Sequence, residues 1–161
     1  MIIISHRGNL NGPSPSTENH PKQIIEAIER GGFFVETDLW YQSGNYFLGH
    51  DHPEHQINID FLLQHKESLY IHCKNIEALE SMSRRTDLHH FWHNTDDHTI
   101  TSNGVVWSYP GATAFRSKES GIQILTLPER ESRSYMRSYI ENFSGLCTDF
   151  PLDFRDVCHG E

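Results

Sequence analysis

The chain has 161 residues, a length that suits a single domain with a substantial core and leaves little room for two. Its 22 acidic and 13 basic side chains give a formal charge of −9, and neither end carries a tract rich in Lys and Arg. We therefore expect one domain over residues 1–161 that does not bind nucleic acid. No apolar stretch approaches the roughly 20 residues that cross a bilayer, so no membrane span is expected.

The start of the chain and its cysteines indicate the cellular compartment in which the protein is expected. Residues 1–6 turn polar at once and lack the basic, apolar and small-residue segments of a secretory signal. Cys73, Cys147 and Cys158 form no C-x-x-C pair, and any pairing leaves one of them over. We expect a cytoplasmic protein without a disulfide framework or a thiolate zinc site.

The predicted strands and helices alternate along the chain, which favours a parallel sheet. Pro21 begins a helix whose apolar stripe includes Ile24 and Ala27, and Gly31-Gly32 ends it. Strands are expected over residues 1–5, 33–39, 46–48, 69–73, 91–92, 105–107, 122–125 and 145–148, with further helices over 76–85 and 135–143.

Such a chain folds either into a barrel or into an open doubly wound sheet, and the pattern alone leaves both possible. A full eight-unit barrel typically takes about 250 residues, so a barrel of 161 residues has to lack helices. The stretch 92–110, with turn signals at Asp96-Asp97 and Asn103-Gly104, predicts strands joined by a β-turn and no helix.

Reactive side chains recur where the predicted strands end. Because residues i and i+2 of a strand point to the same side, Glu36 and Asp38 offer two carboxylates to one side, and His72 and Lys74 pair likewise. Paired carboxylates suit a hard divalent cation. The strand ends and the loops after them hold His6, Arg7, Glu18, Asn19, Glu36, Asp38, His50, Asp51, His72 and Lys74.

Each of these residues alone has a plainer interpretation. Glu36 and Asp38 could lie on a solvated strand face, and Arg7 could form a surface ion pair worth about 0–1 kcal/mol. Their coincidence at the carboxyl ends of strands, where α/β folds place their sites, favours a shared functional site.

The chain resembles the glycerophosphodiester phosphodiesterases of the phospholipase-C-like phosphodiesterase superfamily. The resemblance rests on ordered motifs within residues 1–51, and beyond them only on His72-Cys73-Lys74 and the segment 147–151. The motifs are His6-Arg7-Gly8, Glu18-Asn19, Glu36-Thr37-Asp38 and Gly49-His50-Asp51. The resemblance implies a compact, helix-depleted TIM-type (β/α) barrel of class α/β.

The family's site, carried over to this sequence, implies a metal held by Glu36 and Asp38 with Glu18 nearby. The family's fourth metal position is a Glu and falls here on His72, which removes one negative charge and adds a nitrogen ligand. The resemblance implies Mg²⁺ or Ca²⁺, and the nitrogen makes Mn²⁺ or Zn²⁺ more plausible.

The resemblance further implies His6 and His50 as the acid/base pair, with Arg7 and Lys74 facing the substrate phosphate. This division suits phosphodiester cleavage, which needs charge neutralisation and two proton transfers, each worth typically 10²–10⁴ in rate. In the family a neighbouring hydroxyl of the substrate is the nucleophile and forms a cyclic phosphate.

We therefore expect a metal-dependent hydrolase of a small glycerophosphodiester, or of a similar hydroxyl-bearing phosphodiester, in lipid metabolism. Cleavage of a phosphodiester-linked surface-glycan precursor is the first alternative, and a non-catalytic ligand-binding module on the same scaffold is the second. Asn19, Asp51, His93 and Trp107 are expected to line the pocket. Most of the other histidines, His52, His55, His89, His90, His93 and His98, are expected to be exposed.

Overall fold

The computed structural model of the chain describes residues 1–111, 121–130 and 142–158. One sheet of ten strands dominates these segments, with few helices. The strands are β1 (Ile2–His6), β2 (Phe34–Gln42), β3 (Asn45–Leu48), β4 (His55–Ile57), β5 (Leu69–Cys73), β6 (His90–Trp92), β7 (His98–Ile100), β8 (Val106–Ser108), β9 (Gln123–Thr126) and β10 (Gly145–Thr148). The helices are α1 (Pro21–Glu29), α2 (Ile59–Gln64), α3 (Ile76–Ser83), α5 (Pro151–Cys158) and the 3-10 turn η2 (Pro128–Arg130).

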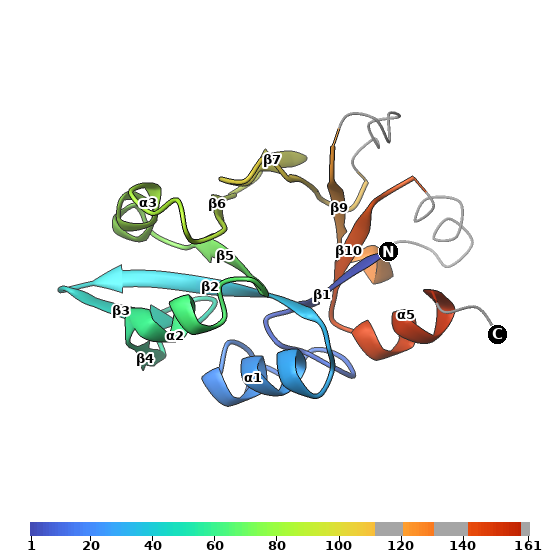
Figure 1. The fold of residues 1–161 in the computed structure, drawn as a ribbon, viewed down its shortest axis with the longest axis horizontal. Helices are drawn as coiled ribbons and strands as arrows, with labels where there is room; N and C mark the ends of the chain where they lie inside the picture. The colour runs from blue at the N-terminus through green and yellow to red at the C-terminus, as the bar shows by residue number, and fades with distance from the viewer. Residues whose placement is uncertain (112–120, 131–141, 159–161) are drawn as a thin grey trace.

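Seven strands run parallel in the order β6-β5-β2-β1-β10-β9-β8. The first and last strands of the chain are therefore neighbours, with Ile2 opposite Gly145 and Ser5 opposite Thr148. Figure 1 shows the sheet curling around a common axis, with α1, α2, α3 and α5 on its outside. The predicted α/β class with a parallel sheet and few helices is confirmed.

The segment between β6 and β8 contains no helix, as its turn signals predicted. β7 pairs antiparallel with β8 through the turn that contains Gly104, whose φ of 79° lies in the left-handed region. The same hairpin approaches β6, where the Ser102 N–H donates to the carbonyl of His90 at 2.8 Å. In the described residues no strand ladder joins β6 to β7 or β8, so the sheet is a curled one that is not shown to close.

Helix α1 follows its sequence signals. The His20 side chain accepts a hydrogen bond from the Lys22 N–H at the amino end, and Pro21 occupies the first turn, where no N–H is needed. Ile24 and Ala27 are buried, and each buried apolar side chain of the size of Ile contributes about 1.5–3 kcal/mol.

Strand β2 is longer than the predicted 33–39, because its second half leaves the parallel sheet. Residues 35–39 pair with β5, whereas residues 39–42 pair antiparallel with β3, which pairs with β4 in turn. This extension places the loop after β3 beside Asp38, whose carbonyl accepts from the Gly49 N–H at 3.2 Å, and beside Lys74, whose Nζ lies 3.4 Å from His50 Nδ1.

Four short elements, β4, α2, η2 and α5, were not predicted. α2 has six residues, too few for a helical stripe, although Asn58 caps it by accepting from the Asp60 N–H. The predicted helix over 135–143 lies almost wholly outside the described residues. No described helix is long and apolar enough to cross a membrane.

The sheet separates two apolar cores. The outer one lies between the sheet and the helices, and the inner one fills the curl of the sheet. Cys73 and Cys147 are free and buried, one in each core. The expectation that most of the remaining histidines are exposed is wrong: His90 is only 8% exposed and its Nδ1 bonds the Leu88 carbonyl, and His89 is partly buried on Thr101.

Candidate active site

A cavity of about 380 Å³ lies at the carboxyl ends of the parallel strands. Its lining combines charged side chains from β1, β2 and β5 with aromatic side chains from β6 and β8. The lining residues are His6, Arg7, Glu36, Asp38, His50, His72, Lys74, Phe91, His93, Asn94, Trp107, Tyr109, Thr126, Leu127, Arg130 and Cys147.

Asp38 is the centre of the polar network. Its Oδ2 accepts hydrogen bonds from Asn19 Nδ2 at 2.9 Å and His50 Nδ1 at 3.1 Å. Its Oδ1 lies 3.5 Å from the Lys74 ammonium. Burial would raise the pKa of this carboxyl, but the hydrogen bond from His50 and the nearby imidazole of His72 outweigh burial and hold the pKa well below its usual range. Asp38 is therefore a carboxylate at neutral pH.

Asn19 fixes Asp38 from behind and does not line the cavity. Its Oδ1 accepts from the Asp38 N–H and from the Thr37 hydroxyl, both at 2.9 Å. Asn19 is 1% exposed and has a φ of 59°, a conformation that Asn tolerates better than most residues. The Glu18-Asn19 motif thus serves local backbone geometry as well as the site.

Three potential ligands converge beside Asp38. One atom each of Glu36, Asp38 and His72 lie within 4.8 Å of one another. Asp38 Oδ1 is buried without a hydrogen-bond partner, although His72 Nδ1 lies 3.0 Å away as an ion-pair partner. A buried carboxylate oxygen that lacks a hydrogen bond and faces two further ligand atoms fits a divalent cation.

The ring of His72 is held in the orientation that a metal ligand needs. Its Nε2–H donates to the His93 carbonyl at 3.1 Å, and the ring stacks on Phe91 with centroids 4.9 Å apart. Nδ1 therefore faces the carboxylates of Asp38 and Glu36. Burial lowers the pKa of His72, but contacts with these two carboxylates outweigh burial and raise the pKa to about 9.

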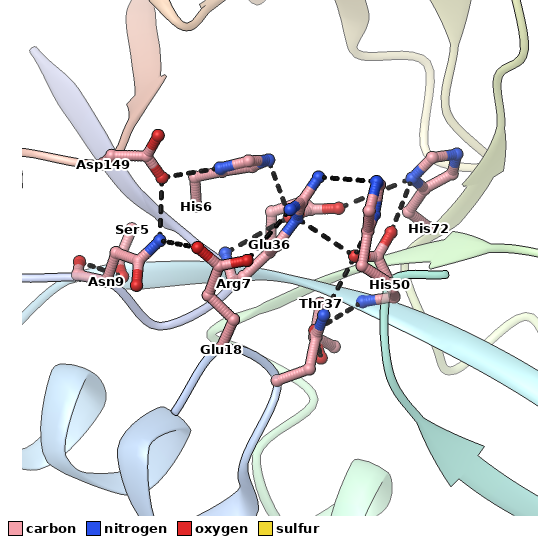
Figure 2. A network of polar contacts seen from close by, with 12 residues as sticks. Ser5, His6, Arg7, Asn9, Glu18, Glu36, Thr37, His50, His72 and Asp149 are labelled. Atoms are coloured by element: carbon pink, nitrogen blue, oxygen red, sulfur yellow. Dashed lines mark hydrogen bonds and ion pairs between the residues drawn. The ribbon is translucent and has the colours of Figure 1, made fainter. Parts of the chain in front are cut away.

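Arg7 occupies the middle of the network in Figure 2. Its guanidinium lies 3.0 Å from Glu18 Oε2 and 3.2 Å from Asp38 Oδ2. Burial lowers the pKa of Arg7, yet the charges of Asp38, Glu36 and Glu18 raise it above its usual value. Glu18 also accepts from Asn9 at 3.1 Å, so the structure places it on Arg7 and outside the three-ligand cluster.

His6 is oriented by a residue that the sequence reasoning missed. Its Nδ1–H donates to Asp149 Oδ1 at 2.7 Å, and Asn9 Nδ2 donates to the same oxygen at 2.8 Å. Nε2 consequently faces the cavity, 3.9 Å from Glu36. Burial raises the pKa of Asp149, but the hydrogen bond from His6 outweighs it and lowers the pKa. In the sequence, Asp149 stood out only as part of the segment 147–151, which resembles the family, and no role was predicted for it.

His50 reaches the same cluster from the loop after β3. Its Nδ1–H bonds Asp38, and its Nε2 accepts from the Arg7 guanidinium at 3.1 Å, because a guanidinium can only donate. Lys74 Nζ lies 3.4 Å from His50 Nδ1. The neighbouring Asp51 points outward, 86% of its side chain is exposed, and it does not line the cavity.

One wall of the cavity is aromatic and begins where Phe91 stacks on His72. Phe91 stacks on Trp107 with centroids 5.0 Å apart, and His93 stacks on Tyr109 at 3.5 Å. Burial and the nearby Glu36 raise the pKa of the Tyr109 hydroxyl, so it stays protonated. His93 and Trp107 therefore lie on the cavity wall, as predicted.

Comparisons with known proteins support the fold. No family model matches the sequence, and no curated protein does. A solved structure described as a putative glycerophosphodiester phosphodiesterase from Galdieria sulphuraria is similar, with a TM-score of 0.54 and 11% identity over 99% of this chain and 98% of that one. The likeness extends over nearly all of both chains and is a likeness of fold.

Proposed function

We propose that this protein is a divalent-metal-dependent phosphodiesterase that hydrolyses a glycerophosphodiester or a similar hydroxyl-bearing phosphodiester. The observation that carries the proposal is the Asp38 carboxylate, whose Oδ1 lacks a hydrogen bond and faces Glu36 and His72 between the cations of Arg7 and Lys74. The curled sheet with few helices supports a TIM-type barrel in which the β7–β8 hairpin lies against β6 through the bond from the Ser102 N–H to the His90 carbonyl.

Glu36, Asp38 and His72 would hold the metal. When bound there, a divalent cation supplies positive charge to a non-bridging phosphate oxygen of the substrate. The fit rests on the unbonded Asp38 oxygen and on the ring of His72, whose Nε2–H is already bound by the His93 carbonyl. A nitrogen ligand in the set favours Mn²⁺ or Zn²⁺ over Ca²⁺ and Mg²⁺.

The two neighbouring cations bind and orient the phosphodiester. Arg7 presents a planar guanidinium held in place by Glu18, and Lys74 adds a point charge beside Asp38. Both cations are already positioned by carboxylates, so little reorganisation is needed when the negative charge on phosphorus oxygens grows.

Two histidines transfer the protons. Because Asp149 holds the Nδ1–H of His6, the lone pair on Nε2 faces the cavity and can accept the proton of the attacking hydroxyl. As the bond from phosphorus to the leaving oxygen breaks, that oxygen takes a proton from Nε2 of a protonated His50, whose Nδ1–H stays on Asp38. Substrate binding has to draw Arg7 away from His50 Nε2, which then takes its proton from solvent before this step. The step leaves a cyclic phosphate, a proton on His6 and a neutral His50. Water then opens the cyclic phosphate as it gives a proton to His50 Nε2, and His6 returns its proton to the oxygen that leaves phosphorus.

The test is hydrolysis of a glycerophosphodiester panel by metal-stripped protein, with Mg²⁺, Ca²⁺, Mn²⁺ and Zn²⁺ restored singly and the products followed by phosphorus NMR. We expect cleavage that depends on the metal and is lost in His6→Ala. The matched control is His52→Ala, because 71% of the His52 side chain is exposed and it lies outside the cavity.

Activity of the stripped protein without any ion, or full activity in His6→Ala, would contradict the proposed mechanism. Metal binding without turnover of any panel member would instead favour a ligand-binding module. A panel of phosphodiester-linked glycans then separates that result from a glycan-precursor substrate.

A further inference from the structure

The cavity has a second polar edge at the end of β9, away from the carboxylates. Thr126, Leu127 and Arg130 line the same cavity as the metal cluster, but they belong to a different part of the sheet. In the strand order, β9 lies between β8 and β10, with β10 and β1 separating it from β2. Neither the sequence motifs nor the proposed chemistry assigns a role to these residues.

This edge is firmly built. Leu127 has a φ of 49°, which turns the chain sharply after β9, and its N–H donates to the Cys147 carbonyl at 2.7 Å. The Glu129 carboxylate then accepts from the Thr148 hydroxyl at 3.0 Å and from the Asp149 N–H at 2.8 Å. These bonds attach η2 to β10 and leave the next residue, Arg130, at the cavity.

Two polar groups at this edge have no partner in residues 1–111, 121–130 and 142–158. Thr126 is 4% exposed, and its hydroxyl is buried without a hydrogen bond. Arg130 is exposed at the cavity and forms no ion pair with any described residue. The other two cations of the cavity differ, because Arg7 pairs with Glu18 and Lys74 with Asp38.

We propose that Thr126 and Arg130 bind a second anionic group, a carboxylate or a phosphate, carried by the alcohol portion of the substrate. This inference rests on the proposed phosphodiesterase function and names the substrate class. A phosphodiester carries one negative charge, which Arg7 and Lys74 face. A guanidinium without an ion pair among the described residues and a buried hydroxyl are donors that suit a further anion. Both lie on the lining of the same cavity as Arg7 and Lys74, so one substrate can reach all four.

The test uses three glycerophosphodiesters that differ only in the second alcohol: glycerol, glycerate and glycerol phosphate. For the wild-type protein we expect kcat/KM to be at least about tenfold higher for a charged alcohol than for glycerol, mainly through KM. The glycerate and glycerol phosphate arms show whether the carboxylate or the phosphate is preferred. In Arg130→Gln the ratio should fall toward one, and Thr126→Val should lower it part of the way.

The control is Arg30→Gln, because Arg30 follows the end of α1 and 82% of its side chain is exposed. The kcat/KM ratio of this variant should stay at the wild-type value. Equal kcat/KM for all three substrates in the wild type, or an equal loss for all three in Arg130→Gln, overturns the inference. If the metal-loaded protein cleaves none of the three substrates, the proposed phosphodiesterase function is wrong, but the binding of a second anion is still open to test. Calorimetric binding of the same three compounds then tests the inference: tighter binding of the charged compounds that Arg130→Gln removes supports it, and equal binding overturns it.

Discussion

The two sides of the cavity are held together by different forces. The carboxylate side, formed by Glu36, Asp38, His50, His72 and Lys74, is joined by ion pairs and hydrogen bonds in which Asp38 has four basic neighbours. The aromatic side, formed by Phe91, His93, Trp107 and Tyr109, is held by ring stacking. The first arrangement fixes charges in advance of a reaction, and the second fixes the shape of the space beside them.

Replacement of Asp38 should break the carboxylate side most severely. Asp38→Ala leaves the buried guanidinium of Arg7 and the ring of His72 without their shared partner, so we expect the free energy of unfolding to fall by about 3–5 kcal/mol. Urea denaturation measures this loss, and calorimetry should show that metal binding is abolished. Asp87→Ala is the control, because Asp87 pairs with Arg85 at the surface and its removal should leave the urea midpoint unchanged. A stable Asp38→Ala variant that still binds metal would contradict the role of Asp38 as the centre of the carboxylate side and as a metal ligand.

Removal of His6 should abolish chemistry while sparing the fold. Because His6 Nε2 faces the cavity, we expect His6→Ala to lower kcat about 10²–10⁴-fold, with the thermal midpoint checked in parallel. His52→Ala, at an exposed position, should keep the wild-type kcat. A loss of activity that merely follows loss of folded protein would show that His6 is structural.

The carboxylate side should also give the metal-free protein a pH dependence. Contacts with Asp38 and Glu36 raise the pKa of His72 to about 9. Protonated His72 therefore adds to the free energy of unfolding, and this contribution is fully present below its unfolded pKa of about 6.5. It is lost as the pH rises toward 9, because the folded protein then releases the proton that made the pairing favourable.

The stability difference between the wild type and His72→Gln, measured in chelator by urea denaturation, should therefore shrink between pH 6 and pH 9. We expect a change on the order of 3 kcal/mol. Groups common to both proteins cancel in this difference. A difference that is constant across the range would argue that the imidazole is neutral throughout.

The aromatic side should tolerate the loss of a polar atom. The Tyr109 hydroxyl forms no hydrogen bond with any described residue, so Tyr109→Phe keeps the stacking on His93 and removes nothing that is bonded. We expect a stability change within about 0.5 kcal/mol by thermal denaturation. A larger loss would mean that this wall, too, depends on polar contacts.

The carboxylate side was largely predictable because its geometry is local. The i, i+2 spacing puts Glu36 and Asp38 on the same side of one strand, and it does the same for His72 and Lys74. The two strands are parallel neighbours with Asp38 opposite His72, so the two pairs lie together. The role of Glu18 could not be obtained in this way, since its contact with Arg7 depends on the loop conformation between β1 and α1.

The aromatic side and the support of His6 were harder to predict. The bond from His6 to Asp149 depends on the register of β1 against β10, which no local pattern reveals. The β7–β8 hairpin was predicted from its turn residues, yet the stacking of His93 on Tyr109 and the burial of His90 follow from how that hairpin lies against β6. α2 was missed because six residues cannot show a helical period.

The pairing of β1 with β10 also determines the stage of folding at which the site can form. His6 and Asp149 are 143 residues apart, and closing so large a loop costs entropy that the growing chain recovers only when its last strand is available. A topology with such non-local contacts folds slowly compared with a helical bundle of the same size. During synthesis, one edge of β1 therefore stays unpaired until β10 has left the ribosome. The Nδ1–H of His6 gains its acceptor, Asp149, only when β10 pairs with β1.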